Sequence, residues 1–329
     1  MLPFFTKKEE HPLEAYTNGA FACTKCGRRT PLQGLTPLEM GRCSHCDMSN
    51  FVPKRINGFW LFYPLGGGGM GAVYKAYHEQ FLGQFYAVKV LPREKRRDPE
   101  LIHNLQSEAA IVSALGQHPC VVSGVESGYR DDEHYLATQF IEGERLDKRI
   151  ERLGRLPELE VILIALRILA AEAHIYNQGY LFRDLKPENI LITGTEGAYL
   201  YDYGICITID NALKEIGEFV EGSPFYMPPE RLSGGGERPR SELYSLGMVL
   251  YHALAGKTYF NAKELQQLAR QLTSTARLSN LDGKMRKIPE DVATVIDQMI
   301  KREPERRYQT YIDVERDFVK LLAKYTHQA

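Results

Sequence analysis

The sequence predicts an α+β protein in which a β-rich small lobe is followed by a larger helical lobe. Short apolar runs typical of strands occupy much of the chain between residues 59 and 141, interrupted by one helical segment. After Gly143 the apolar residues recur mostly at the spacing of helices. Four of the six cysteines fall between residues 21 and 52, ahead of both lobes, and indicate a separate small module.

These patterns divide the chain into four parts. Residues 1–20 form a loose polar lead-in, residues 21–52 the cysteine module, residues 53–58 a linker and residues 59–324 the main domain. Within that domain we expect the small lobe at residues 59–141 and the large lobe at residues 144–324. With 329 residues, 43% of them apolar, the chain is long enough for a large core and one small extra module.

Individual elements follow from the apolar spacing and from turn residues. The expected strands cover residues 59–65, 72–77, 85–91, a pair around 121–128, and 135–141. The first helix should begin with Asp98 as its N-cap and Pro99 as its first helical residue. Further helices are expected at residues 157–178, 241–255, 261–273, 288–302 and 310–325.

Charge and composition exclude several classes of protein. The net charge of −1 gives no overall attraction to nucleic acid or to an anionic membrane. The N-terminal residues lack the pattern of a signal peptide, and the most apolar run, Val161 to Ala171, holds Arg167 and is too short to span a bilayer. The basic run Arg93 to Arg97 is typical of a solvated loop. We therefore expect a soluble cytoplasmic protein without membrane contact.

One stretch of the chain gathers the groups that phosphoryl transfer needs. Asp184, Lys186 and Asn189 lie within six residues, and Asp202 follows in the run Asp202-Tyr203-Gly204. Phosphoryl transfer requires an acceptor for the substrate's hydroxyl proton, a cation near the moving group and oxygen ligands for Mg²⁺. A carboxylate, an amine, an amide and a second carboxylate supply all three, so the run predicts a phosphoryl-transfer site.

A glycine-rich run near the start of the small lobe indicates a loop that binds nucleotide. Gly66, Gly68 and Gly71, between Leu65 and Val73, fit the spacing G-x-G-x-x-G-x-V, in which glycines let backbone amides approach phosphates. By itself the run also suits a plain hairpin turn, and its neighbours decide between the two interpretations.

Those neighbours are Lys89, in an apolar strand, and Glu108, on the helix that follows. A lysine among apolar residues is costly without a partner. We therefore expect Glu108 to pair with Lys89 and to aim its ammonium group at nucleotide phosphates. The alternative is an edge-strand lysine that faces water.

With the later run Gly222-Ser-Pro-Phe-Tyr-Met-Pro-Pro-Glu230, these motifs resemble the eukaryotic-like (Hanks-type) serine/threonine protein kinases. The run Gly-Gly-Met-Gly-Ala-Val-Tyr-Lys-Ala is most similar to the bacterial branch of that family. The resemblance covers roughly residues 59–324 and implies the two-lobed protein kinase fold. It also implies ATP as phosphoryl donor, Mg²⁺ with Mn²⁺ as an alternative, and serine or threonine hydroxyls of proteins as acceptors.

The resemblance assigns roles to residues of this chain. Asp184 would orient the acceptor hydroxyl and take its proton, and Lys186 would stabilise the transferring phosphoryl group. Asn189 and Asp202 would hold Mg²⁺. The ATP site would comprise Leu65, Gly66, Gly68, Gly71, Val73, Ala87, Lys89, Glu108, Thr138, Gln139, Ile141 and Leu191. In that set Val73, Ala87 and Leu191 sandwich the adenine.

Residues 135–143 resemble the strand and hinge that read the adenine edge, with Thr138 as gatekeeper and backbone bonds from Gln139 to Ile141. An ordinary strand and turn is the alternative there. Ser223 would face the substrate, and the run from Lys186 to Asn189 resembles kinases that act on serine and threonine. Glu230 should form a structural ion pair with Arg307, although the neighbouring Arg306 competes for that role.

Three residues depart from the family's pattern. Phe182 replaces a histidine, Tyr203 replaces a phenylalanine, and Glu242 replaces an aspartate that normally anchors the catalytic-loop backbone. Because the catalytic groups remain, we expect an active kinase, and a nucleotide-binding pseudokinase scaffold is the alternative. The segment from 205 to 221 contains a single hydroxyl, Thr208, and several acids (Asp210, Glu215, Glu218 and Glu221), so we expect a carboxylate rather than a phosphate to pair with Arg183.

The cysteine module has the spacing of a metal site. Cys23 and Cys26, followed sixteen residues later by Cys43 and Cys46, would place four thiolates around one ion. The module resembles a zinc ribbon, with iron as the alternative to Zn²⁺. We expect it to contact a protein partner or to brace the small lobe, and a nucleic-acid contact through its local basic residues is the less favoured role.

Overall fold

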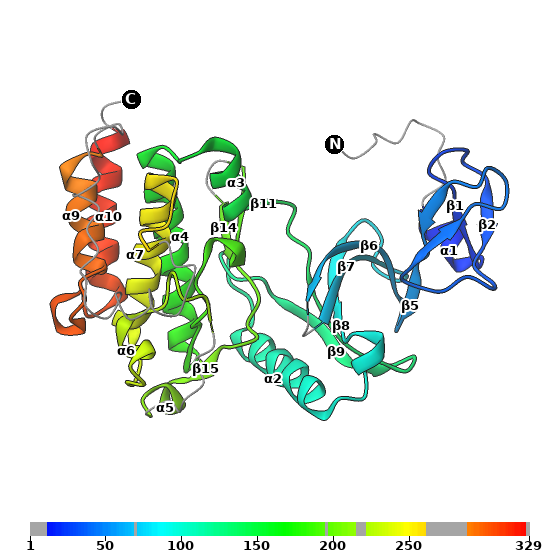
Figure 1. Cartoon of the computed structure of the whole chain (residues 1–329), viewed down its shortest axis with the longest axis horizontal. Helices are drawn as coiled ribbons and strands as arrows, with labels where there is room; N and C mark the ends of the chain where they lie inside the picture. Colours follow the sequence, from blue (N-terminus) through cyan, green and yellow to red (C-terminus); the bar gives the residue numbers. More distant parts are fainter. Residues whose placement is uncertain (1–11, 69–70, 195–196, 215–221, 261–287, 327–329) are drawn as a thin grey trace. The chain divides into compact units, whose positions relative to one another are not determined.

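The computed structural model describes residues 12–68, 71–194, 197–214, 222–260 and 288–326. Its backbone contacts divide the chain into two units (Figure 1). The first unit comprises residues 1–109 and 124–140, and the second comprises residues 110–123 and 141–329. The helix predicted at residues 261–273 lies outside the described residues.

The centre of the first unit is a six-stranded antiparallel sheet. Its strands are β5 (Lys54–Ile56), β6 (Phe59–Gly68), β7 (Gly71–His78), β8 (Phe85–Val90), β9 (Gly124–Arg130) and β10 (Glu133–Gln139), in the order β5-β6-β7-β8-β10-β9. Tyr86, Val88 and Val90 alternate along β8 with less buried residues, and they pack in one core cluster with Ile56 and Phe59. This alternation leaves the opposite face of β8 free to line a site.

Helix α2 (Pro99–Leu115) begins where the sequence predicts it. The Asp98 side chain accepts hydrogen bonds from the backbone N–H groups of Glu100, at 3.0 Å, and of Leu101, at 3.4 Å. An N-cap of this kind satisfies donors that the helix itself cannot. The helix therefore starts at a fixed residue, and this start determines which face of the helix carries Glu108.

The N-terminal module is built from α1 (Pro12–Thr17) and two small hairpins. Strand β1 (Ala20–Ala22) pairs with β2 (Arg29–Pro31), and β3 (Met40–Arg42) pairs with β4 (Ser49–Phe51). We expected a loose lead-in over residues 1–20, yet residues 12–17 are helical. The reason is burial, because Leu13 packs with Trp60 and Tyr77 of the sheet.

A second difference concerns residues 53–58, which we expected to be a linker. Lys54–Ile56 instead forms β5, the edge strand that pairs with β6, and Ile56 has no exposed surface. Asn57 and Gly58 turn the chain between the two strands with φ angles of 46° and 85°. An Asn-Gly pair with positive φ at both residues is the strongest short-range hairpin signal. We expected a linker because the neighbouring residues are charged and polar, and that prediction was wrong.

The second unit is mainly helical. Among the described residues, its α-helices are α3 (Leu146–Leu153), α4 (Glu158–Asn177), α5 (Ile209–Ala212), α6 (Pro229–Leu232), α7 (Pro239–Ala255), α9 (Glu290–Met299) and α10 (Tyr311–Thr326). Figure 1 shows α4, α7, α9 and α10 side by side, and α7 is buried along most of its length. A helix that is buried on several faces belongs to the centre of a bundle.

Short strands of the second unit hold the loops between the helices. Strands β11 (Glu144–Arg145), β13 (Ile190–Thr193) and β14 (Gly197–Leu200) form one small sheet, and β12 (Tyr180–Leu181) pairs with β15 (Ile207–Thr208). The loop between β12 and β13 is therefore fixed at both ends. In the described part of the chain, no helix combines the length and apolar character that crossing a bilayer would require.

Candidate active site and metal centre

The predicted catalytic residues meet in the loop between β12 and β13. Pro187 begins a short 3-10 helix (Pro187–Asn189) that turns the chain back, which brings Lys186 and Asn189 to the carboxylate of Asp184. One oxygen of that carboxylate, Oδ2, accepts hydrogen bonds from Lys186 Nζ at 2.6 Å and from Asn189 Nδ2 at 2.8 Å. Asn189 Nδ2 also donates to the Asp184 backbone carbonyl at 2.9 Å. These bonds fix the orientation of the aspartate.

The second oxygen of Asp184 has a different environment. Oδ1 is buried and, among the described residues, no hydrogen-bond donor reaches it. A buried acceptor without a donor is costly, and such groups in native proteins usually have a functional reason. An oriented carboxylate with one unused oxygen can accept the proton of a hydroxyl group brought to it.

A cavity of about 480 Å³ opens beside these residues in the second unit. It is lined by Arg145, Lys186, Glu188, Asn189, Tyr201, Asp202, Gly222 and Ser223. Asp202 has a φ of 68°, a conformation that non-glycine residues seldom adopt and that is common at functional sites. The amide of Asn189 and the carboxylate of Asp202 line one cavity and are the hard oxygen ligands that Mg²⁺ prefers.

Glu242, at the start of α7, anchors the backbone of the loop between β12 and β13 (residues 182–189), which is called the catalytic loop below after the residues predicted there. Both carboxylate oxygens accept the backbone N–H of Arg183, at 3.2 and 3.0 Å. Burial raises the pKa of Glu242 to about 7, with Arg231 opposing the shift and Glu237 reinforcing it. The glutamate thus makes the backbone contact for which an aspartate is typical in this family.

The other two departures from the family's pattern lie against each other. The rings of Phe182 and Tyr203 are both buried and meet edge to face, with centroids 5.8 Å apart. The Tyr203 hydroxyl donates to the backbone carbonyls of Leu200, at 2.8 Å, and of Val122, at 3.2 Å. The added hydroxyl is therefore satisfied within the second unit, and the aromatic packing that we expected at these positions is present.

In the first unit, the glycine-rich run forms the end of the hairpin of β6 and β7. Gly66 pairs with Val73 and Gly68 pairs with Gly71 in the register of the sheet. Gly71 has a φ of 148°, and a Cβ atom at this residue would lie 2.9 Å from the Val90 carbonyl oxygen. A side chain at Gly71 would therefore force the hairpin away from β8, and Leu65 on the same hairpin is exposed.

Lys89 and Glu108 form an ion pair with Nζ and Oε2 2.7 Å apart. Both side chains are largely shielded from solvent, and Val73 is the register partner of Lys89 on β7. Ala87, two residues before Lys89, pairs with Thr138 on β10, so all four side chains share one face of the sheet. This face is opposite the one that carries the core residues Val88 and Val90.

Of the remaining predicted ATP-site residues, Thr138, Gln139 and Ile141 lie near the point at which the chain passes from the first unit to the second, and Leu191 lies within the second unit. Thr138 Oγ1 donates to the Ala87 carbonyl at 3.3 Å, and Gln139 pairs with Tyr86 at the end of β10. Ile141 begins the second stretch of the second unit. Leu191 belongs to β13 and follows Ile190, two residues after the catalytic-loop amide of Asn189.

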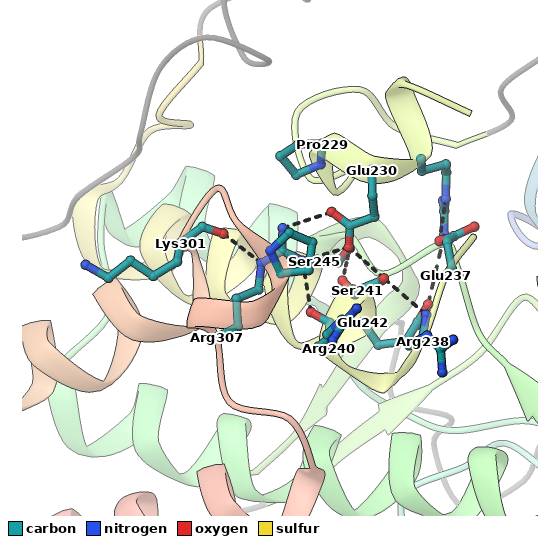
Figure 2. A network of polar contacts seen from close by, with 12 residues as sticks. Pro229, Glu230, Glu237, Arg238, Arg240, Ser241, Glu242, Ser245, Lys301 and Arg307 are labelled. Atoms are coloured by element: carbon teal, nitrogen blue, oxygen red, sulfur yellow. Dashed lines mark hydrogen bonds and ion pairs between the residues drawn. The ribbon is translucent and has the colours of Figure 1, made fainter. Parts of the chain in front are cut away.

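An ion pair predicted from the sequence holds the helices of the second unit together. Arg307 donates to both oxygens of Glu230, at 2.7 and 2.8 Å, and to the backbone carbonyls of Lys301, Arg302 and Arg240 (Figure 2). The competing residue, Arg306, is exposed. The guanidinium group suits this role because its planar donors match a carboxylate and several carbonyls at once.

The four clustered cysteines come together in the N-terminal module. Their sulfur atoms all lie within 4.8 Å of one another, with Cys23 and Cys46 3.6 Å apart and Cys26 and Cys43 3.7 Å apart. Cys23 and Cys26 lie on one turn, and Cys43 and Cys46 lie on a second turn of the same kind. In each turn the residue directly after the second cysteine has a positive φ, 69° at Gly27 and 58° at Asp47. The two turns therefore present their thiols to one point.

The surroundings of these thiols suit a bound cation. The backbone N–H groups of Lys25 and His45 each donate to a cysteine sulfur at 3.4 Å, as they would to a thiolate. The hydroxyl of Thr30, helped by the N–H of His45, lowers the pKa of Cys43 to about 5. Four soft sulfur ligands at this spacing fit Zn²⁺ in tetrahedral geometry, and the residues present therefore fit a metal.

Comparison with known proteins places this arrangement in a family. A family model described as the protein kinase domain matches residues 61–319. The chain belongs to the protein kinase family. Serine/threonine-protein kinase PrkC of Bacillus subtilis is 31% identical over 271 residues, which are 81% of this chain and 41% of that protein. Serine/threonine-protein kinase PknH of Mycobacterium bovis is 33% identical over 258 residues, 76% of this chain and 41% of that protein.

A probable serine/threonine-protein kinase of Clostridium perfringens is similar as well, with 31% identity over 80% of this chain and 38% of its own length. The chain thus spans about two fifths of the length of these relatives. Together the matches confirm the predicted fold class and the resemblance to bacterial serine/threonine kinases.

The partner of Arg183 lies outside the segment in which we expected it. We expected a carboxylate from the segment 205–221, of which residues 215–221 lie outside the described part of the chain. Arg183 Nε instead donates to Glu237 Oε1 at 2.8 Å, and Glu237 lies between α6 and α7. Glu237 follows three glycines, and a glutamate in such a turn is typically exposed to solvent. No sequence pattern therefore indicated that it is buried.

Proposed function

We propose that this kinase domain transfers the γ-phosphoryl group of ATP to serine and threonine hydroxyls of proteins, with Mg²⁺ or Mn²⁺ as the assisting ion. The observation that carries the proposal is the carboxylate of Asp184, with one oxygen fixed by Lys186 and Asn189 and the other without a donor among the residues that the structure describes. The two residues that hold this carboxylate, Lys186 and Asn189, line a cavity together with Asp202 and Ser223. The names of the similar kinases support serine and threonine as acceptors.

Each residue has a distinct part in the proposed reaction. Asp184 Oδ1 accepts the proton of the substrate hydroxyl as the oxygen attacks phosphorus. The ammonium group of Lys186, held 2.6 Å from the same carboxylate, compensates negative charge that develops on the transferring group. The metal, when bound to Asn189 and Asp202, would supply further charge neutralisation for the phosphates.

In the first unit, Lys89 would bind ATP phosphates while Glu108 holds its ammonium group in place. Val73 and Ala87 share the face of the sheet that carries Lys89, which supports them as the surface that covers the adenine. The backbone amides of the Gly66–Gly71 hairpin would cradle the phosphates, and the hinge at Gln139 to Ile141 would read the adenine edge. Leu191 would complete the adenine sandwich.

The alternative is a pseudokinase that binds nucleotide without transferring phosphate. This alternative is suggested by the three departures from the family's sequence pattern, at Phe182, Tyr203 and Glu242. The contacts of Tyr203 and Glu242 favour the active enzyme, because the hydroxyl of the first is satisfied and the second still anchors the Arg183 N–H. A measurement of phosphate transfer separates the active kinase from the pseudokinase.

The experiment measures transfer of labelled phosphate from ATP and Mg²⁺ to a generic basic protein by the 329-residue chain. Wild type is compared with Asp184→Asn and Lys89→Met, and the exposed Lys95→Met serves as a matched control for the second. We expect both site variants to lose at least about 100-fold in rate, since general base catalysis and phosphate positioning each contribute on that scale. Equal labelling by wild type and both site variants would end the active-kinase proposal.

We further propose that the cysteine module binds Zn²⁺ and braces the small lobe. Only Val52 and Pro53 separate β4 of the module from β5 of the kinase sheet. The rings of Phe51 and Tyr74 lie 5.9 Å apart, and Leu38 packs against the core cluster of the sheet. These contacts favour a brace over a tethered nucleic-acid module, whereas a protein partner on the outer side of the module is compatible with them.

Iron is the alternative to zinc at this four-cysteine site. Reduced, clustered thiols are typical of the cytoplasm, which is where we propose that the protein acts.

A further inference from the structure

Glu237 is a buried acid in the turn between α6 and α7, and it bridges two arginines. Its carboxylate has no exposed surface. Oε1 accepts a hydrogen bond from Arg183 Nε at 2.8 Å, and Oε2 accepts one from Arg231 Nε at 2.7 Å. Figure 2 shows Glu237 in the same polar network as Ser241 and Glu242.

The two arginines are also bound to the catalytic loop. Arg231 NH1 donates to the backbone carbonyl of Arg183 at 2.6 Å, and the backbone N–H of Arg183 is held by Glu242. Arg183 directly precedes Asp184 and has a φ of 68°. The backbone N–H and the backbone carbonyl of Arg183 are thus both held by side chains. Glu237 is the anion that pairs with the guanidinium groups of both Arg183 and Arg231.

Charge explains why an anion is needed at this place. The side chains of Arg231 and Arg183 retain 1% and 9% of their exposure. A buried guanidinium without a paired carboxylate is strongly unfavourable, because its charge has lost its contact with water and gains no partner in exchange. Without Glu237 the cationic side chain of Arg183 would turn toward water or another anion, and the backbone of Asp184 would move with it.

The same turn touches the segment that follows Asp202. The backbone N–H of Glu237 donates to the carbonyl of Ala212, the last residue of α5, at 2.7 Å. A Cβ atom at Gly236 would lie 2.6 Å from the Leu213 carbonyl oxygen, so only glycine allows the turn to approach so closely. Glu237 therefore links the catalytic loop, α6 and the start of the segment 205–221 in one place.

We propose that Glu237 is a built-in counterion that positions the catalytic loop, so that phosphoryl transfer needs no prior phosphorylation of the segment 205–221. A phosphate on that segment would bring up to two negative charges and three acceptor oxygens to an arginine beside the catalytic aspartate. Glu237 already supplies one charge and two oxygens, and both oxygens are used. This inference rests on the proposed kinase function.

The first test measures transfer by phosphate-free protein. The full chain is produced with a protein phosphatase, intact mass confirms the absence of phosphate, and the initial rate on a generic basic protein is measured before autophosphorylation accumulates. We expect a rate within about twofold of the autophosphorylated enzyme, and Thr208→Val, which removes the single hydroxyl of residues 205–221, to behave alike. Thr208 makes no side-chain cap to α5, so its loss leaves that helix intact.

The outcomes separate the inference from the proposed function. A protein that is inactive without phosphate and gains turnover after phosphorylation would overturn the inference and leave the kinase function standing. A protein that transfers no phosphate in either state would overturn both.

The second test asks whether Glu237 acts on the reaction or only on stability. Glu237→Gln keeps the shape and removes the charge, and Glu230→Gln does the same to the ion pair of Glu230 with Arg307, which does not touch the catalytic loop. Assays are run well below both melting temperatures. We expect Glu237→Gln to lower kcat by about 10- to 100-fold with KM for ATP unchanged, because small misplacement of a catalytic group has effects of this size.

Glu230→Gln should lower the melting temperature and leave kcat within about twofold. If the two variants lost kcat only in proportion to their unfolded fraction, Glu237 would be a structural residue and the inference would be wrong. Should Glu237→Gln fail to fold, the rate of the phosphate-free wild type decides the question alone.

Discussion

The carboxylate of Glu242 holds the backbone N–H of Arg183 with both oxygens, at 3.2 and 3.0 Å. Glu242 lies on α7 in the centre of the helical bundle, and Arg183 is the residue before the proposed base. A helix that is buried along most of its length is thereby bonded to the catalytic loop at a residue with positive φ. A glutamate achieves this with one methylene more than the aspartate typical of the family.

Glu242→Ala should therefore weaken both the fold and the loop. The substitution leaves the buried N–H of Arg183 without an acceptor, a loss of about 1 to 3 kcal/mol of unfolding free energy. Denaturant unfolding measures that change. The matched control is Glu315→Ala, at an exposed residue of α10, for which a change below about 0.5 kcal/mol is expected. Equal effects of the two substitutions would show that the anchor contributes nothing.

A second buried acid near this anchor makes stability depend on pH. Glu172 on α4 is fully buried, and within the described residues neither of its carboxylate oxygens has a hydrogen-bond partner. Burial, and then the charge of Glu242, raise the pKa of the Glu172 carboxyl well above its ordinary 4.5. A group whose pKa is raised by folding stabilises the fold in its protonated form, and that stabilisation is lost as pH rises through the folded-state pKa.

Glu172→Gln should remove this dependence. The free energy of unfolding of wild type, relative to the variant, should fall by up to about 1.4 kcal/mol per pH unit once pH exceeds the ordinary glutamate range. Thermal unfolding between pH 5 and pH 9 measures the difference between the two proteins, in which the titrating groups that do not interact with Glu172 cancel and the interaction of Glu172 with Glu242 is included. A difference that stayed constant, or that grew in favour of wild type with rising pH, would contradict the assignment.

Local spacing was sufficient to predict much of the site. Asp184, Lys186 and Asn189 are close in sequence, so a single turn at Pro187 brings them together, and the N-cap at Asp98 fixed the start of the helix that carries Glu108. The pair of Lys89 with Glu108 followed from the cost of burying a charge, whereas the pair of Glu230 with Arg307 followed only from the resemblance to the kinase family.

The missed features depend on packing between distant segments. Glu237 is buried because α6, α7 and the catalytic loop enclose it, and its own neighbours Gly234, Gly235 and Gly236 are typical of an exposed turn. Strand β5 was missed for a different reason, since the Asn57-Gly58 hairpin signal was present but its charged flanks suggested a linker. The helix α1 is short, and it exists because Leu13 is covered by Trp60 and Tyr77 of the sheet.

Arg307→Met should destabilise the second unit strongly. The guanidinium group is fully buried, and its removal takes the charged partner from the Glu230 carboxylate, which keeps, among the described residues, only the hydrogen bond from the Ser241 hydroxyl, and takes a donor from three backbone carbonyls. Breaking a buried ion pair on one side costs about 3 to 5 kcal/mol of unfolding free energy. Arg306→Met is the control, because Arg306 is adjacent in sequence and exposed, and it should change stability by less than about 0.5 kcal/mol. A larger loss for Arg306→Met than for Arg307→Met would reverse the assignment of the pair.

Removal of the metal from the cysteine module should affect the nucleotide loop as well as the module. The ring of Phe51 lies against the ring of Tyr74, and Leu38 packs against the same core cluster as Tyr74. Tyr74 is three residues after Gly71, on the strand that carries the nucleotide loop. Few apolar residues lie within the module, so the metal supplies much of its folding free energy. We expect one zinc ion per chain, and we expect chelation to lower the melting temperature by about 10 °C, which corresponds to a few kcal/mol.

Nucleotide affinity is the decisive readout, because it reports on the first unit without requiring catalysis. Cys43→Ser should abolish zinc binding and weaken binding of an ATP analogue several-fold, since β7 loses the support of Phe51. Cys120→Ser is the control, because Cys120 is buried outside the cluster, and that variant should keep both the zinc and the affinity. If Cys43→Ser lost zinc but kept the affinity, the module would be independent of the nucleotide loop and its role would be sought in a partner. If iron rather than zinc were bound, visible absorption by the purified protein would reveal it, and the brace would be tested with that ion.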